Sequence, residues 1–124
     1  MIEDKLTEKI IEIAYKIHNK LGSGFLEKVY ENAMMIELEK NGFKAKQQFH
    51  IPVYYENIIV GDYYADSIIE DKIIIELKAI ENLLKIHEVQ LVNYLKGTNI
   101  EIGLLINFGR SVRIKRKYKT YKKL

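Results

Sequence analysis

The sequence predicts a single α+β domain over residues 1–124, in which helices pack on a mixed β-sheet. Two observations predict this class. Apolar residues recur at intervals of three and four over residues 3–40 and 81–96, as they do in amphipathic helices. Residues 43–79 and 102–118 instead show the short apolar runs and alternation of strands. A third observation, 124 residues of which 48% are apolar, indicates one packed core.

Two helices are expected first. The helical spacing covers residues 3–21 and is followed by Gly22-Ser23-Gly24, which ends the pattern. A second helix is expected over 25–40, with Asn41-Gly42 as its stop. Because the connection is so short, the two helices are expected to pack against each other.

Three strands are expected next, over 43–55, 58–69 and 72–79, joined by tight turns. Pro52 predicts an edge strand or a bulge, and Gly61 predicts a bend in the second strand. The third strand contains Ile73-Ile74-Ile75, a run typical of a strand that is covered on both faces. Consecutive strands with short turns favour a meander.

A third helix is expected over 81–96, followed by a buried strand over 102–108 and an edge strand over 112–118. A helix between two strands allows a crossover connection, which would place 102–108 parallel to 72–79. The predicted order is therefore ααβββαβ with one further edge strand.

Composition excludes several classes of protein. The chain has no cysteine, which excludes disulfides and thiolate metal sites, and its three histidines show no zinc-ligand spacing. No apolar run approaches the ~20 residues that span a bilayer, and the first residues lack the order of a signal peptide. We expect a cytoplasmic protein with no membrane association.

The charge is distributed unevenly. Residues 110–124 contain eight of the 20 basic residues and no acid, which leaves 12 basic and 17 acidic residues, a net charge of −5, in 1–109. A basic segment suits the phosphate backbone of nucleic acid. The alternatives are a solvated tail, or contact with the acidic body of a second copy in a homodimer. The candidate contacts are Arg113, Lys115, Arg116, Lys117 and Lys119.

Two carboxylates and a lysine mark the third strand and its neighbour. Glu76 and Lys78 are two residues apart on a strand, so they share a face. Ionised groups at the end of a buried strand are costly to desolvate, and a site for a divalent cation and a phosphate accounts for them. Asp66 and Glu76 offer the hard oxygen ligands that Mg²⁺ prefers. The alternatives are an exposed ion pair for Glu76 and Lys78, and a turn cap or a pair with Lys72 for Asp66.

A larger set of motifs surrounds these residues in a fixed order. A GxxExxY motif opens the second helix, and a Glu-Leu-Lys triplet ends the third strand. The motif residues are Gly24, Glu27 and Tyr30, then Asp66, then Glu76-Leu77-Lys78, then His87, Gln90 and Tyr94, then Gly103, Asn107, Phe108 and Gly109. With these motifs in this order and spacing, the chain from about residue 3 to residue 114 resembles the GxxExxY family, a small branch of the PD-(D/E)XK nuclease superfamily.

The resemblance implies a restriction-endonuclease-like core ordered αβββαβ, with an extra N-terminal helix. It implies Mg²⁺- or Mn²⁺-dependent hydrolysis of phosphodiester bonds in DNA or RNA. The catalytic residues that it implies are Glu27, Asp66, Glu76, Lys78 and Gln90. The metal ligands would be Asp66, Glu76, the peptide carbonyl of Leu77, and Glu27 directly or through water. The alternative function is a non-catalytic nucleic-acid-binding or protein-interaction module that keeps the fold.

The remaining polar and aromatic candidates have structural interpretations. His18 and His87 lie on apolar helix faces, where a histidine is usually a hydrogen-bonded core residue. Tyrosines in strands usually pack against the sheet, although they can also stack on bases. We expect packing for Tyr54, Tyr55, Tyr63 and Tyr64.

Overall fold

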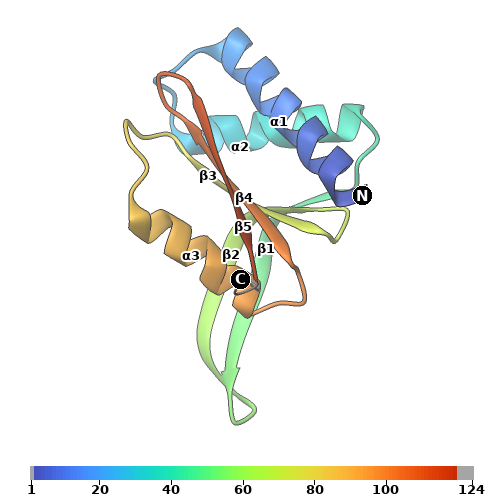
Figure 1. Ribbon diagram of the computed structural model, residues 1–124, viewed down its shortest axis with the longest axis vertical. Helices are drawn as coiled ribbons and strands as arrows, with labels where there is room; N and C mark the ends of the chain where they lie inside the picture. The colour runs from blue at the N-terminus through green and yellow to red at the C-terminus, as the bar shows by residue number, and fades with distance from the viewer. Residues whose placement is uncertain (1, 120–124) are drawn as a thin grey trace, which may run out of the picture.

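The computed structural model describes residues 2–119. Three helices and five strands follow in the order ααβββαββ (Figure 1). They are α1 (Ile2–Leu21), α2 (Glu27–Lys40), β1 (Ala45–Tyr55), β2 (Ile58–Ile69), β3 (Ile73–Lys78), α3 (Lys85–Lys96), β4 (Ile102–Phe108) and β5 (Val112–Tyr118). The predicted order is confirmed. Two helices begin later than expected, α2 at Glu27 rather than 25 and α3 at Lys85 rather than 81.

The five strands form one sheet whose spatial order β1-β2-β3-β4-β5 is also the chain order. β3 and β4 are parallel, and every other neighbouring pair is antiparallel. The expected meander and the expected parallel pairing through a crossover helix are therefore both confirmed. The sheet is mixed and the fold is α+β.

The two faces of the sheet are covered by different helices. One apolar core joins α1 and α2 to alternate residues of β3 and β4, including Ile73, Ile75 and Leu104. The other joins α3 to the intervening residues, including Ile74 and Leu105. Figure 1 shows α1 and α2 together, with α3 apart from them. Successive side chains of a strand alternate between faces, so β3 contributes to both cores.

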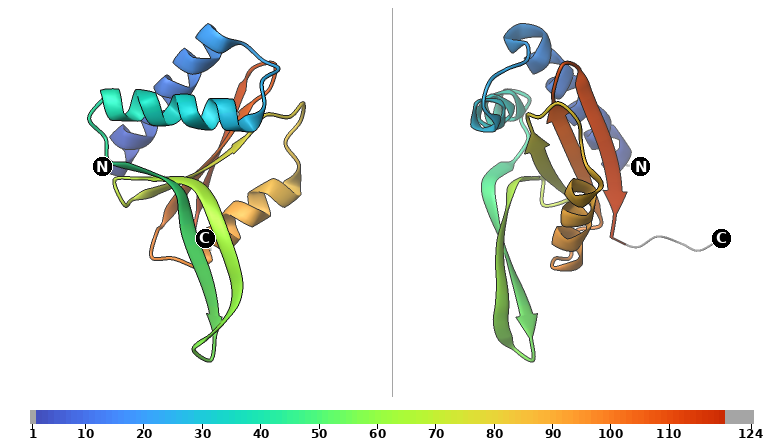
Figure 2. Two further views of the ribbon diagram at one scale, coloured as in Figure 1. Left: turned by 180° about the vertical axis from the view of Figure 1, so that it is seen from behind. Right: turned by 90° about the vertical axis from the view of Figure 1, so that its left-hand side faces the viewer.

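The β1–β2 hairpin extends as an arm beyond the rest of the fold (Figures 1 and 2). Its turn residues, Glu56 and Asn57, have φ of 48° and 66°, the left-handed pair that a type I′ hairpin turn requires. The register shifts by one residue between Val53 and Tyr54, next to Gly61. The bend expected at Gly61 is thus a bulge, and β1 lies at the sheet edge, as Pro52 indicated.

Asn107 fixes the segment that leaves β3. Its side-chain oxygen accepts the Ile80 N–H at 3.0 Å, and its side-chain nitrogen donates to the Ile80 carbonyl at 2.9 Å. A Cβ atom at Gly109 would lie 2.8 Å from that carbonyl oxygen, so glycine is needed for the approach. These contacts hold the end of β3, where Glu76 and Lys78 lie.

Within residues 2–119, no helix combines the length and the apolar character needed to cross a bilayer.

Candidate functional site

Asp66 and Glu76 are joined across the β2–β3 ladder by two hydrogen bonds. Glu76 Oε1 accepts the backbone N–H of Asp66 at 2.9 Å, and Asp66 Oδ2 accepts the backbone N–H of Leu77 at 2.6 Å. Both side chains are buried, with 9% of Asp66 and 6% of Glu76 exposed. Each carboxylate is therefore held in place by the backbone of the opposite strand.

Burial perturbs both acids strongly. It raises the pKa of Asp66 to about 7, against the hydrogen bond from Leu77, and the charge of Glu27 raises it further. Burial also raises the pKa of Glu76 to about 8, and the nearby Asp66 adds to this while Lys78 opposes it. Near neutral pH the two carboxyls hold protons that an ordinary Asp or Glu would have lost. A cation of suitable size would take the place of those protons.

Glu27 belongs to the same electrostatic neighbourhood. It is the first residue of α2, where the helix dipole favours a negative charge. Partial burial raises the pKa of Glu27, the positive charge of Lys78 lowers it, and Glu31 raises it again. Glu27 and Lys78 thus act electrostatically on the Asp66–Glu76 pair, but among residues 2–119 no three acidic or histidine side chains lie close enough together to form a ligand set.

Glu31 is a further acidic residue that acts on Asp66, although no sequence motif indicated it. The residue is only 4% exposed, and its carboxylate accepts hydrogen bonds from Lys28 at 2.8 Å, from Gln47, and from Gln48 at 3.1 Å. Burial alone would raise the pKa of Glu31, but these bonds outweigh burial and lower it. The resulting charge raises the pKa of Asp66. The sequence did contain one signal, because Glu27 and Glu31 are four residues apart and therefore share a helix face.

Gln48 has an unusual backbone conformation beside the pair. Its φ is +56°, a left-handed value that non-glycine residues rarely adopt inside a strand. The pairs Gln47–Ser67 and Phe49–Ala65 flank it, which places Gln48 opposite Asp66. Strained conformations of this kind cost on the order of 1–3 kcal/mol and concentrate at functional sites. A glutamine in a predicted strand gave no sequence signal of this.

Gln90 reaches the cluster through Tyr94. The Gln90 amide nitrogen donates to the Tyr94 hydroxyl at 3.0 Å, across one turn of α3. Burial raises the pKa of Tyr94 to about 12, with contributions from the charges of Glu76 and Asp66. The shared helix face predicted for Gln90 and Tyr94 is therefore present, and Tyr94 interacts electrostatically with the two carboxylates.

Other residues of the motifs have structural contacts. The Tyr30 hydroxyl donates to the Gly22 carbonyl at 2.6 Å, and the Tyr30 ring stacks on Phe108 at a centroid distance of 4.5 Å. These contacts hold the α1–α2 connection, from which Glu27 follows.

His18 Nε2 contacts the Gly109 carbonyl at 2.8 Å, and His87 Nδ1 accepts the Leu84 N–H at 3.0 Å. Both histidines are hydrogen-bonded as expected, but both are only partly buried and neither belongs to an apolar core.

The predicted basic contacts divide between two faces of β5. Alternation places Arg113, Lys115 and Lys117 on one face and Arg116 on the other. Arg116 Nη1 lies 3.4 Å from an Asp4 carboxylate oxygen on α1, and Lys117 Nζ lies 2.5 Å from a Glu88 oxygen on α3. Arg113 and Lys115 are exposed, and residues 120–124 of the basic segment lie outside the described residues.

Lys119, the last of the predicted contacts, donates from Nζ to the carbonyl oxygen of Thr98 at 2.7 Å. The basic residues that pair with the body of the protein are thus less available to a phosphate than Arg113 and Lys115.

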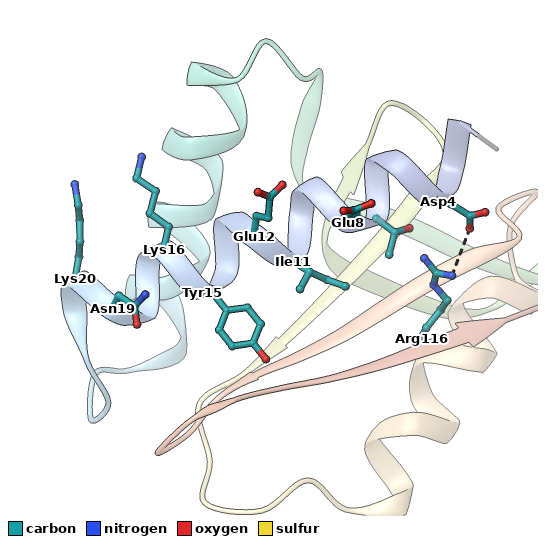
Figure 3. Close-up of a pocket in the computed structure, with 10 residues that line it drawn as sticks. Asp4, Glu8, Ile11, Glu12, Tyr15, Lys16, Asn19, Lys20 and Arg116 are labelled. Atoms are coloured by element: carbon teal, nitrogen blue, oxygen red, sulfur yellow. Dashed lines mark hydrogen bonds and ion pairs between the residues drawn. The ribbon is translucent and has the colours of Figure 1, made fainter.

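A large hollow on the described surface lies away from Asp66 and Glu76. It is an open groove of about 740 Å³ along the outer side of α1, closed at one end by the ion pair between Arg116 and Asp4 (Figure 3). Glu8 and Glu12 line it together with Ile11 and Tyr15. Nothing in this lining resembles the buried carboxylate pair, so we place the candidate site at Asp66 and Glu76 rather than in the groove.

Comparison with known proteins identifies the class of the fold. The sequence profile of the PD-(D/E)XK nuclease superfamily matches residues 4–120, and the chain belongs to this superfamily. The mixed sheet is accordingly of the restriction-endonuclease-like type. None of the curated proteins matches the chain.

A solved structure supports the same fold. The chain is similar to the protein in "Crystal structure of SSO0001", with a TM-score of 0.58 and 20% sequence identity. The similarity covers 77% of this chain and 52% of the other, so the chain spans about half the length of that protein. At this identity the likeness concerns the fold alone.

Proposed function

We propose that this chain is a divalent-metal-dependent nuclease of the GxxExxY branch, which hydrolyses phosphodiester bonds in nucleic acid. The observation that carries the proposal is the buried Asp66–Glu76 pair beside Lys78. Burial and mutual repulsion make the charged pair unfavourable in isolation, as the pKa values of about 7 and 8 indicate. A bound cation would favour the charged form of both carboxylates, which accounts for a buried acidic pair.

The donor set suits Mg²⁺ or Mn²⁺. Asp66, Glu76 and the Leu77 carbonyl are hard oxygen ligands, with Glu27 as a further ligand directly or through water. Among residues 2–119, no three acidic or histidine side chains stand ready as a ligand set. Mg²⁺ does not require one, because it usually keeps several waters and binds one or two carboxylates.

Residues around the carboxylates supply the remaining functions. When bound, the cation would lower the pKa of a water and stabilise charge on the phosphate. Lys78 contributes a fixed positive charge that orients the scissile phosphate. Gln90 and Tyr94 hold each other on the α3 side, and Glu31 holds Gln48 on the β1 side. The exposed cations Arg113 and Lys115 are the best remaining candidates for contact with the nucleic-acid backbone. A cytoplasmic location and a homodimer stay predictions.

A nuclease assay tests the proposal. Single- and double-stranded DNA and RNA are incubated with the wild-type protein and Mn²⁺, and with the Lys78→Ala variant. Loss of one preorganised charge should reduce cleavage by on the order of 10²–10³-fold. Lys96→Ala, at an exposed lysine that ends α3, is the matched control and should cleave normally.

Two outcomes would reject the proposal that this chain is a nuclease. One is the absence of cleavage of all four substrates by a folded wild-type protein. The other is equal cleavage by the wild-type and Lys78→Ala proteins, which would indicate a contaminating enzyme. Nucleic-acid binding without cleavage would favour the non-catalytic binding module.

A further inference from the structure

The β1–β2 arm leaves large apolar side chains uncovered. Its exposed apolar residues have between 47% and 67% of their surface accessible, and they are Tyr54, Tyr55, Ile58, Ile59, Val60, Tyr63 and Tyr64. The expectation that the four tyrosines pack on the fold holds only in part. Tyr54 and Tyr55 are 60% and 66% exposed on the arm, which extends past α3 (Figure 2), whereas Tyr63 and Tyr64 make ring contacts. A group of neighbouring exposed apolar side chains is typical of a binding surface.

Tyr63 contacts α3 through its ring. Its ring lies 5.7 Å from the Tyr94 ring, at an interplanar angle of 46°. A Cβ atom at Gly61 would lie 3.1 Å from Tyr63 Cε2, so the glycine leaves room for the ring. The ring is thus held against Tyr94 in the space that Gly61 leaves, while 47% of the residue stays exposed. Tyr64 instead stacks on His50, with a centroid distance of 4.8 Å.

Tyr63 also lies near the carboxylate pair. It precedes Asp66 by three residues in β2, a distance of about 10 Å along a strand. Its ring partner, Tyr94, interacts electrostatically with both Glu76 and Asp66. A nucleotide next to a phosphate bound at the carboxylates could therefore reach Tyr63.

Charge on the arm decides which part of a nucleotide would bind there. No lysine or arginine occurs between Lys46 and Lys72, whereas Glu56 and Asp62 do. Such a surface repels a phosphate backbone, or at least offers it no positive charge to bind. The face of a base is uncharged and stacks on tyrosine with little regard to sequence.

We propose that Tyr63 is a stacking platform for an unpaired base next to the scissile phosphate, and that the substrate is therefore single-stranded nucleic acid. The inference rests on the proposed function. In a duplex both faces of each base are already stacked on neighbours, so a single tyrosine on this arm has no base face to contact. A second copy of the chain, bound through the arm, is the competing occupant.

Binding without cleavage tests the inference. Anisotropy in EDTA measures the affinity of a fluorescent single-stranded oligonucleotide, of the same strand lacking its bases, and of a duplex. Wild-type protein should bind the intact strand more tightly than the abasic strand. Tyr63→Leu should weaken binding of the intact strand by about 5- to 150-fold, the equivalent of one lost stacking contact. Tyr63→Phe should bind as the wild type does.

Tyr55→Leu is the matched control, because Tyr55 is an exposed tyrosine of the same arm next to its turn. It should leave affinity unchanged. The inference is overturned if wild-type protein binds abasic and intact strands equally, or if Tyr63→Leu and Tyr55→Leu weaken binding alike. It is also overturned if both variants lower the mass measured by light scattering, which would assign the arm to a second copy. Since EDTA prevents metal-dependent cleavage, these outcomes are independent of the nuclease assay.

Discussion

The two faces of β3 bury different kinds of residue. Toward α1 and α2, β3 presents Ile73, Ile75 and Leu77, which belong to a core of 16 buried apolar residues in the described chain. Toward α3 the same strand presents Ile74 and then Glu76 and Lys78, beside a core of only eight. One six-residue strand therefore supplies a stabilising face and a chemical face.

The difference shows how the fold tolerates its site. A buried charged group such as Glu76 and a strained residue such as Gln48 both lower the stability of the folded state. The larger core on the opposite face offsets that loss, as is usual when a functional site conflicts with stability. Substitutions on the two faces should consequently have opposite effects on stability.

The largest expected effect is on the α1–α2 face. Ile75 is fully buried, so Ile75→Ala should lower the free energy of unfolding by about 2–5 kcal/mol. Ile59→Ala, at an arm residue that is 53% exposed, should change it by no more than ~0.5 kcal/mol. Urea unfolding followed by circular dichroism measures both. Equal losses would mean that the α1–α2 core is not the stabilising one.

A cation should stabilise the other face by a similar amount. Mn²⁺ at ~100 times its dissociation constant would add about 2.7 kcal/mol if it binds only the folded state, or roughly 3–6 °C in melting temperature per kcal/mol. The Asp66→Asn variant should lose this shift, whereas Ile75→Ala should keep it. Thermal melts with and without Mn²⁺ measure the shift. The metal site would have to be abandoned if Asp66→Asn responded as strongly as wild type.

Without metal, the acidic pair should make stability depend on pH. The folded-state pKa values of Asp66 and Glu76, about 7 and about 8, lie above their ordinary values of 3.8 and 4.5. The folded state therefore binds more protons between these limits, and the free energy of unfolding should fall as pH rises from about 4 to about 8.

Asp66→Asn removes part of that cost. In EDTA at pH 8 the variant should be more stable than wild type by on the order of 1–3 kcal/mol, and its pH profile should be flatter. Urea unfolding at pH 5 and pH 8 checks this. A wild-type protein that becomes more stable toward pH 8 would show that the buried acids are not the controlling groups.

A smaller effect is expected at the α1–α2 connection. Tyr30→Phe removes the hydrogen bond to the Gly22 carbonyl but keeps the ring on Phe108, which should cost about 0.5–1.5 kcal/mol. Because the connection precedes Glu27, cleavage should fall by more than the loss of folded protein explains. Parallel measurement of unfolding and of cleavage by the folded fraction separates the two effects. Unchanged cleavage would remove Tyr30 from the support of the site.

The smallest effect is expected on β5. Replacing the exposed Arg113 and Lys115 with alanine should flatten the plot of log affinity against log salt by about 0.7–0.9 per lost phosphate contact. Arg116→Ala should flatten it less, because Arg116 lies against Asp4. Anisotropy titrations at several salt concentrations test this. An unchanged slope in the double variant would leave β5 without a role in binding.

The fold could be predicted because its signals are local. Apolar spacing and turn residues such as Glu70-Asp71, whose φ values are 54° and 55°, specify elements within a few positions. The site could be predicted only in part. Asp66, Glu76 and Lys78 gave a pattern within one hairpin, whereas the hydrogen bonds of Glu31 depend on β1, 16 residues away. The ring contact of Tyr63 with Tyr94 joins β2 to α3, which no local pattern specifies.

The position of α1 has a consequence for synthesis of the chain. Its apolar side is buried in a core that Val112 of β5 completes, and its Asp4 pairs with Arg116, 112 positions later. Because α1 is synthesised well before β5, its apolar residues wait for β5 before their cover is complete. During that interval Ile10, Ile13 and Ile17 are open to chaperones and to other nascent chains. The same contact that stabilises the finished protein makes complete burial of α1 depend on a segment about a hundred positions later.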